Sequence, residues 1–162
     1  MSTLPRAIEF SMAGFSFRVI HGGVTRINRF IFPSSDQQTK LEELQQAECD
    51  VIIGGHSGLP FGDRLGNSTW LNAGVIGLPA NDGTTDGWYL LLNPRDGQID
   101  CEWQRLQYDF VRSQQSMLAA GLDDYAESLV SGLWPSMDIL PEQERGKRGQ
   151  RIEPFSLTLS PR

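Results

Sequence analysis

The most constraining feature of this sequence is a short apolar run that does not alternate with polar residues. Residues 49–56 read Cys-Asp-Val-Ile-Ile-Gly-Gly-His, so Val51, Ile52 and Ile53 are consecutive β-branched residues. Successive side chains of a strand point to opposite faces, and the run therefore predicts a strand that is buried on both sides. Such a strand needs a covering layer on each face. The helix that we expect from Gln37 to Glu48 can provide one of these layers.

Alternating and apolar segments predict further strands on either side of this run. The expected strands are Phe15 to Ile20, Trp70 to Leu78, Gly87 to Leu92 and Gln98 to Gln107. Two short helices should follow, because Asp109 can cap one that ends at Gly121 and Asp123 can begin another. The residues after these helices are expected to form loop. Their basic cluster, Gly146 to Arg151, is either a solvated chain end or an anion-binding patch.

Composition places the chain among globular proteins and excludes several functions. Lys and Arg total 14 against 20 Asp and Glu, a formal net charge of -6, which disfavours a general nucleic-acid binder. No apolar run approaches the roughly 18 residues of a membrane span, and the first residues do not resemble a signal peptide, so we expect a cytoplasmic protein. The two cysteines, Cys49 and Cys101, form no CxxC pair and are expected to be reduced thiols.

Both histidines of the sequence stand directly after a predicted strand and next to glycine. His21 follows the strand that ends at Ile20, and His56 follows the apolar run. Strand ends are where a rigid sheet presents side chains to a ligand, and imidazole is the commonest metal ligand near neutral pH. One histidine alone is readily explained as a partly buried structural side chain. The shared context of the two points to a common site instead.

A second candidate segment runs from Trp70 to Gly83, where a strand is interrupted by small residues and ends in a polar turn. Its plain interpretation is a bulged strand followed by a turn. Alternatively, Asn72 offers an amide to a ligand at the sheet edge, and Gly74 permits the close approach. The arginines around the first histidine either bind phosphate or remain solvated surface charges; they are Arg18, Arg26 and Arg29.

Three motifs resemble those of a known family: VIHGG at residues 19–23, DVIIGGHSGLPF at 50–61 and WLNAGVIGLPANDG at 70–83. In this order and spacing they resemble the later half of a calcineurin-like metallophosphoesterase. The segment GLWPSMDILP at 132–141 is similar to the tail of bacterial members. The resemblance implies an α+β fold, a β-sandwich flanked by helices (αββα). Residues 1–140 would form the C-terminal half of that domain, and residues 141–162 a C-terminal tail.

The resemblance also implies a chemistry. In that family two divalent metals hold a hydroxide that attacks the phosphorus of a phosphate mono- or diester. His21 and His56 would be ligands of one of these metals. Asn72, Asp82 and Arg18 would support the metal ligands or contact the phosphate of a phosphorylated small molecule. The identity of the metal stays open among Mn, Fe, Zn, Ni and Co, because imidazole and carboxylate ligands suit all of them.

The sequence departs from the family pattern at two places. Gly58 stands where the motif GH-x-H has its second histidine. The motifs D-x-H, G-D and G-N-H-D/E, which supply the other ligands, do not occur in the residues before Val19. We therefore expect a partial domain that is inactive alone. Its uncovered strands should recruit a complementary N-terminal half or a second copy of the chain.

Three hypotheses for the function follow. The first is a metal-dependent phosphoesterase of which this chain carries one part. The second is a non-catalytic module of the same fold that binds a metal, an anion or a protein. The third is a phosphotransfer site with His21 as the nucleophile, although no arginine directly precedes this histidine.

Overall fold

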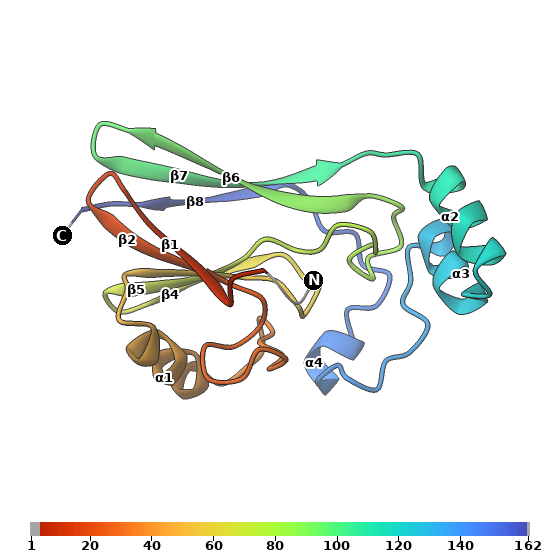
Figure 1. The fold of residues 1–162 in the computed structure, drawn as a ribbon, viewed down its shortest axis with the longest axis horizontal. Helices are drawn as coiled ribbons and strands as arrows, with labels where there is room; N and C mark the ends of the chain where they lie inside the picture. The colour runs from red at the N-terminus through yellow and green to blue at the C-terminus, as the bar shows by residue number, and fades with distance from the viewer. Residues whose placement is uncertain (1–3, 162) are drawn as a thin grey trace.

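The structure, a computed structural model, describes residues 4–161 and consists of two β-sheets packed face to face, with helices at the periphery (Figure 1). The strands are β1 (Ala7–Met12), β2 (Phe15–Ile20), β3 (Val51–Gly54), β4 (Phe61–Leu65), β5 (Ser68–Asn72), β6 (Gly87–Arg95), β7 (Gln98–Leu106) and β8 (Phe155–Leu159). The helices are α1 (Gln37–Ala47), α2 (Phe110–Ala119), α3 (Asp123–Ser131) and α4 (Glu142–Arg145). This is the α+β architecture that the sequence predicts.

The larger sheet has the strand order β1-β2-β3-β5-β4. Its three central strands, β2, β3 and β5, are parallel, whereas the edge strands β1 and β4 pair antiparallel with their neighbours. The carboxyl ends of β2, β3 and β5 therefore meet at one edge of the sheet. The residues that follow these three strands are brought together there.

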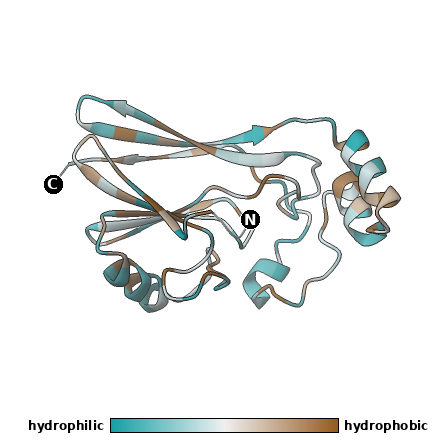
Figure 2. Ribbon diagram, viewed as in Figure 1, coloured by the Kyte–Doolittle hydropathy of each residue, from teal (hydrophilic) through white to brown (hydrophobic). Residues whose placement is uncertain are grey.

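The central strand β3 is covered on both faces, as its apolar run predicts. Val51 is 1 % exposed and belongs to the core between the two sheets, which includes Trp88 and Trp103 of the smaller sheet β6-β7-β8. Ile52 is fully buried in a second core, where Leu44 of α1 packs against the opposite face. Figure 2 shows the apolar residues concentrated along the strands, while α1 and α4 are mostly hydrophilic. Both covering layers come from this chain itself, so the expectation that this strand is left uncovered is wrong.

Three details of the expected secondary structure are wrong. The C-terminal residues do not remain loop: Phe155–Leu159 form β8, which pairs antiparallel with β7. The strand expected from Trp70 to Leu78 ends at Asn72, because Gly74 has a positive φ of 83° and its N–H bonds to the Asn72 side chain. The edge strands β1 and β4 were not expected at all, since their short sequences carry weak patterns of their own.

The other predicted elements form near their expected positions, although β6 continues past Leu92 to Arg95 and the short helix α4 forms among residues expected to be loop. The strand Phe15–Ile20 has the expected bounds, and α1 ends one residue early because Glu48 adopts a left-handed conformation with φ 51°. Asp109 caps α2 by accepting a hydrogen bond from the Arg112 N–H. Among residues 4–161, no helix has the length and apolar character that crossing a membrane requires.

Candidate functional site

The two histidines lie next to each other at the carboxyl edge of the parallel strands. β2 and β3 are parallel neighbours with Val19 opposite Ile53, so the residues after them continue side by side. The Gly55 N–H donates a 2.9 Å hydrogen bond to the His21 carbonyl, which extends the pairing by two residues. The imidazole rings of His21 and His56 have centroids 4.5 Å apart and are tilted by 55°. The structure thus brings together the pair that the sequence singled out.

Glycines permit this close approach. A Cβ at Gly22 would lie 2.6 Å from the carbonyl oxygen of Ile27 and 3.3 Å from the Cβ of His56. Any side chain there would push apart the two loops that carry the histidines. His56 itself has a positive φ of 41°, a conformation that L-residues adopt at a cost of about 1–2 kcal/mol. The surrounding loops therefore hold His56 in a strained position.

The ring of His56 is also in contact with an aromatic side chain. Phe30 stacks on it, with the centroids 4.2 Å apart and the planes 23° from parallel. Burial and the neighbouring His21 lower the pKa of His56, against a hydrogen bond with the Asn28 backbone that acts in the opposite direction. At neutral pH the imidazole is consequently uncharged, the form in which a ring nitrogen has a lone pair for a metal.

A buried carboxylate on α1 holds the loop that follows His21. Glu43 is 1 % exposed and accepts hydrogen bonds from the backbone N–H groups of Val24 and Thr25. It also accepts a 2.9 Å bond from the Thr25 hydroxyl and a 2.7 Å bond from the guanidinium of Arg29. Burial alone would raise the pKa of Glu43, but its bonds to Arg29, Thr25 and Val24 outweigh burial and lower it. The ionised carboxylate thus anchors the His21 loop to the helix.

Sequence reasoning missed Glu43, although a signal was present. Lys40, Glu43, Leu44 and Ala47 recur at helical spacing and form the buried side of α1. Two charged residues on an otherwise apolar face must have partners, because unpaired buried charges are very costly. Lys40 likewise finds Asp63 of β4 and the carbonyl oxygen of Pro33. A polar residue at a core position of a predicted helix is therefore a sign of an anchoring contact.

Asn72 supports the loop that carries His56. It is 1 % exposed, and its amide donates to the carbonyl of Gly55 at 2.7 Å and to the Ser57 hydroxyl at 2.9 Å. Its side-chain oxygen accepts the N–H of Gly74 at 3.0 Å. These bonds hold the residues on both sides of His56. The amide is thus engaged within the protein, where it positions His56 and is not turned toward a ligand.

Asp82 is engaged elsewhere. Its carboxylate is 2.9 Å from the guanidinium of Arg105 on β7, and it accepts a 2.7 Å bond from the Thr84 hydroxyl. It also accepts the backbone N–H of Ile152 at 3.1 Å. These contacts join the segment after β5 to β7 and to the C-terminal residues. In the structure, Asp82 therefore connects segments of the protein to one another.

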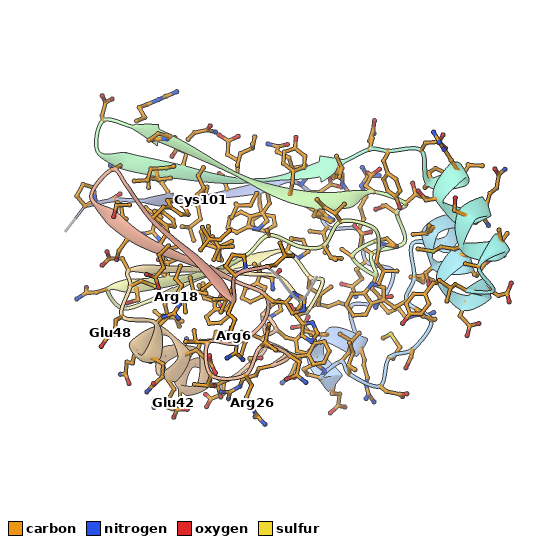
Figure 3. The ribbon with its side chains drawn as sticks, in the orientation of Figure 1. Arg6, Arg18, Arg26, Glu42, Glu48 and Cys101 are labelled. Atoms are coloured by element: carbon orange, nitrogen blue, oxygen red, sulfur yellow. The ribbon has the colours of Figure 1, made fainter. Side chains whose placement is uncertain are left out.

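Arg18 lies on the face of β2 that packs against α1. Its guanidinium donates a 3.4 Å bond to the carbonyl of Ala47, the last residue of α1, and lies 3.5 Å from Glu9 on β1. In Figure 3 Arg18 lies over α1, near the end of the helix at Glu48. A cation is favourable at a helix carboxyl end, where the unpaired carbonyls carry partial negative charge. Its polar contacts are thus with α1 and β1, although it also lines a small hollow with Gly23 and Val24 of the loop after His21.

The position of Gly58 has no room for a histidine. A Cβ on Gly58 would lie 2.9 Å from the ring of Trp134, and the residue has φ 73°. Trp134 is buried and is held by a 2.6 Å bond from its indole N–H to the Pro79 carbonyl. The C-terminal part of the chain therefore fills the place where the GH-x-H motif would put its second histidine.

The two imidazoles are the metal-ligand set that this edge offers. Within residues 4–161, no three or more His, Cys, Asp or Glu side chains gather as a metal cluster would. Two imidazole nitrogen donors suit one divalent transition metal and leave its other positions to water. They do not make up the ligands of two metals. A single, weakly held metal fits these residues, and a dinuclear centre does not.

The cysteines are not part of the site. Both are free thiols, as expected. Burial raises the pKa of Cys101, which has no exposed surface, to about 12. Burial also raises the pKa of Cys49. Neither thiolate is populated at neutral pH, so neither cysteine is a reactive nucleophile.

Comparison with solved structures identifies the fold. A metallophosphoesterase from Sphaerobacter thermophilus superposes with a TM-score of 0.66 at 18 % identity, over 82 % of this chain and 59 % of its own. A hypothetical protein from Pyrococcus horikoshii OT3 has a TM-score of 0.68 at 12 % identity, over 82 % of this chain and 52 % of its own. Vps29 of Chaetomium thermophilum has a TM-score of 0.55 at 12 % identity, over 98 % of this chain and 60 % of its own.

These similarities concern the fold alone, because the identities are so low. No family model matches the sequence, and a search of curated proteins finds no match. The chain spans between 52 % and 60 % of the length of the three structures. The arrangement of its two sheets and α1 is nevertheless the one expected from the motifs around His21 and His56. The chain has a metallophosphoesterase-like fold.

Proposed function

We propose that this chain binds one divalent transition metal through His21 and His56 and forms part of a metal-dependent phosphoesterase site. The observation that carries the proposal is the proximity of the two imidazole rings at the carboxyl ends of adjacent parallel strands. Their centroids are 4.5 Å apart. Glu43 and Asn72 support it, because they anchor the two loops that carry the histidines. Ligands held in this way lose little freedom when the metal binds.

The chain alone does not hydrolyse phosphate esters under this proposal. Phosphoester hydrolysis by metals requires a nucleophile, and it requires neutralisation of the charge that develops on the phosphate. When bound, the metal supplies Lewis-acid stabilisation of the phosphate oxygens. His21 and His56 would hold it at the carboxyl ends of β2 and β3. The remaining ligands would come from a complementary segment or from a second copy of the chain, and the substrate would be a phosphorylated small molecule.

A second candidate is a non-catalytic binding module of the same fold. Gly58 favours it, because Trp134 occupies the space that the second motif histidine would need. The packing of the core thus leaves no room for this metal ligand. The coverage of β3 on both faces by this chain's own elements also favours it. In that case the metal or an anion is bound without turnover.

Calorimetric titration with Zn²⁺ or Mn²⁺ tests the metal site. We expect weak binding of one metal per chain, and loss of at least tenfold in affinity in both His21→Ala and His56→Ala. Arg26→Gln is a matched control, because Arg26 is exposed on the same loop and its backbone contacts are retained. Equal affinity of the parent and both alanine variants would refute the site.

Inorganic phosphate distinguishes the two candidates. A phosphoesterase site binds phosphate through its metal, and by reciprocity phosphate must then tighten metal binding. Metal titrations with and without phosphate should therefore differ in affinity if the site is of the phosphoesterase kind. Unchanged metal affinity would favour the non-catalytic module. A nitrophenyl phosphate assay with added metal should give background rates under either proposal, and robust hydrolysis lost in His21→Ala would overturn the inactivity of the isolated chain.

A further inference from the structure

A cavity of about 380 Å³ lies where the C-terminal segment crosses the sandwich. Its walls come from four separate parts of the chain: Pro33 before α1, the start of β4, the residues after β5, and the segment from α4 to β8. Neither histidine lines it. Cavities of this size, at the lower end of the roughly 300–1,000 Å³ range of small-molecule sites, accommodate compact organic ligands.

The floor of the cavity is apolar and rigid. It is formed by Leu59, Pro60, Phe61, Ala80 and Phe155. Phe61 and Ala80 are 6 % and 2 % exposed, so both belong to the packed core. Phe155 stacks on Trp103 with the ring centroids 4.5 Å apart. A preformed apolar floor favours a ligand with an aromatic or branched apolar body, because little has to be ordered when it binds.

The rim carries two cationic side chains. Lys147 and Arg151 line it together with one carboxylate, that of Glu144. Glu144 is 4 % exposed and is already engaged, since it accepts the Ser34 N–H at 2.9 Å and lies 3.3 Å from the Lys147 ammonium. Arg151 forms an ion pair with Glu153, and both side chains are more than half exposed, so this pair exchanges readily with solvent. Arg151 can therefore receive an anion by exchanging its solvent-exposed partner Glu153 for the ligand.

We propose that this cavity binds a small organic monocarboxylate with an aromatic or branched apolar body. The apolar part rests on the floor near Phe61 and Phe155, and the carboxylate is received at the rim by Arg151, with Lys147 beside it. Arginine binds a carboxylate through two parallel N–H···O bonds, which fixes the orientation of the ligand. Glu144 and Glu153 disfavour a dianion such as a phosphate ester, because together they balance the charges of Lys147 and Arg151.

Binding in this cavity would stabilise the C-terminal segment. That segment is held to the sandwich by the Gly149 N–H on the Asn81 carbonyl at 2.9 Å and by the Ile152 N–H on Asp82 at 3.1 Å. A ligand that contacts Pro60 on one side and Arg151 on the other adds a further connection. Because it binds only the folded state, it raises the free energy of unfolding.

A titration followed by amide chemical shifts tests the proposal, with 3-phenylpropionate as the probe. We expect saturable shifts at residues 59–62, 80–81 and 147–155. Two further probes separate the contribution of the charge from that of the apolar body. The alcohol 3-phenylpropan-1-ol lacks the charge, and acetate lacks the apolar body. Each should bind at least fivefold more weakly than 3-phenylpropionate. Absence of saturable shifts at these residues, or equal affinity for the acid and the alcohol, would overturn the proposal.

Two variants test the role of the rim. Arg151→Gln should weaken 3-phenylpropionate binding at least fivefold without changing the fold, because its side chain is exposed. Arg148→Gln is the matched control, since Arg148 lies in the same exposed segment but does not line the cavity, and its affinity should stay within twofold of the parent. Equal effects of the two substitutions would show a nonspecific charge effect and overturn the assignment. No metal enters this experiment, so its outcome does not bear on the histidine site.

Discussion

Glu43 and Arg29 form the contact that fixes the loop after His21. The Arg29 guanidinium lies 2.7 Å from the Glu43 carboxylate, and the side chain of Glu43 is 1 % exposed on α1. The same carboxylate accepts the backbone N–H groups of Val24 and Thr25. One buried residue of a helix therefore determines the path of a loop that carries a candidate ligand.

Replacing this carboxylate should destabilise the protein substantially. Glu43→Ala leaves Arg29 and two backbone N–H groups without their acceptor, and we expect a loss of about 2–4 kcal/mol. Urea unfolding of the variant measures this loss. Glu42→Ala is the control, because Glu42 is exposed and bonds only to Gln38, and it should change stability by less than about 0.5 kcal/mol. Similar losses for the two variants would contradict the anchoring role.

The same contact predicts a pH dependence. The pKa of Glu43 is lowered by folding from an ordinary value of 4.5, so its ionised form stabilises the folded state. This contribution is complete above pH 4.5 and is lost as the pH falls through the lower folded pKa. Glu43→Gln should therefore show a smaller loss of stability than the parent between pH 5 and pH 2, about the range over which a paired carboxylate titrates. Parallel pH profiles of the two proteins would show that Glu43 does not contribute.

Restoring the motif histidine should damage the protein. Gly58→His places a Cβ 2.9 Å from Trp134 at a positive φ, and we expect it to cost at least about 2 kcal/mol, from both overpacking and backbone strain. Gly66→Ala separates these causes, since Gly66 has a similar φ of 64° with nothing within 4 Å. It should cost only the backbone part, about 1–2 kcal/mol. Thermal unfolding compares the variants, and a Gly58→His protein as stable as the parent would show that Trp134 does not close this position.

The C-terminal strand should be essential to the core. Leu159 of β8 is 4 % exposed between the sheets, so Leu159→Ala should cost about 2–5 kcal/mol of unfolding free energy. Ser156→Ala, on the same strand but exposed, should be nearly neutral. Denaturant unfolding of both variants decides this. A small effect of Leu159→Ala would mean that β8 is not packed in solution.

The sequence predicts the parts of this fold that local patterns determine. The consecutive Val51, Ile52 and Ile53 require a strand buried on both faces, and this strand places His56 beside His21 once β2 is its parallel neighbour. β8 has only five residues, and its assignment depends on pairing with β7, which lies far away in the sequence. Local patterns therefore do not identify it.

The candidate site likewise combines residues that local patterns identify with contacts that depend on the three-dimensional fold. The two histidines stand out in the sequence because each follows a strand and precedes or follows glycine. The contact between Gly58 and Trp134 joins residues far apart in the chain, and no spacing rule predicts it. Asn72 stands out in the sequence as a polar residue at a strand end, but its role depends on the hydrogen-bond partners that the fold places around it. Its bonds to Gly55 and Ser57 become visible only in three dimensions.

The most direct test of the metal site observes the imidazole nitrogens themselves. Zn²⁺ is titrated into ¹⁵N-labelled protein, and the side-chain nitrogen signals of both histidines are followed by long-range ¹H–¹⁵N correlation. The proposed site predicts that one nitrogen of His21 and one nitrogen of His56 shift together and that both are saturated by one metal per chain. A shift of only one histidine, or of neither at saturating Zn²⁺, would contradict a metal shared between His21 and His56.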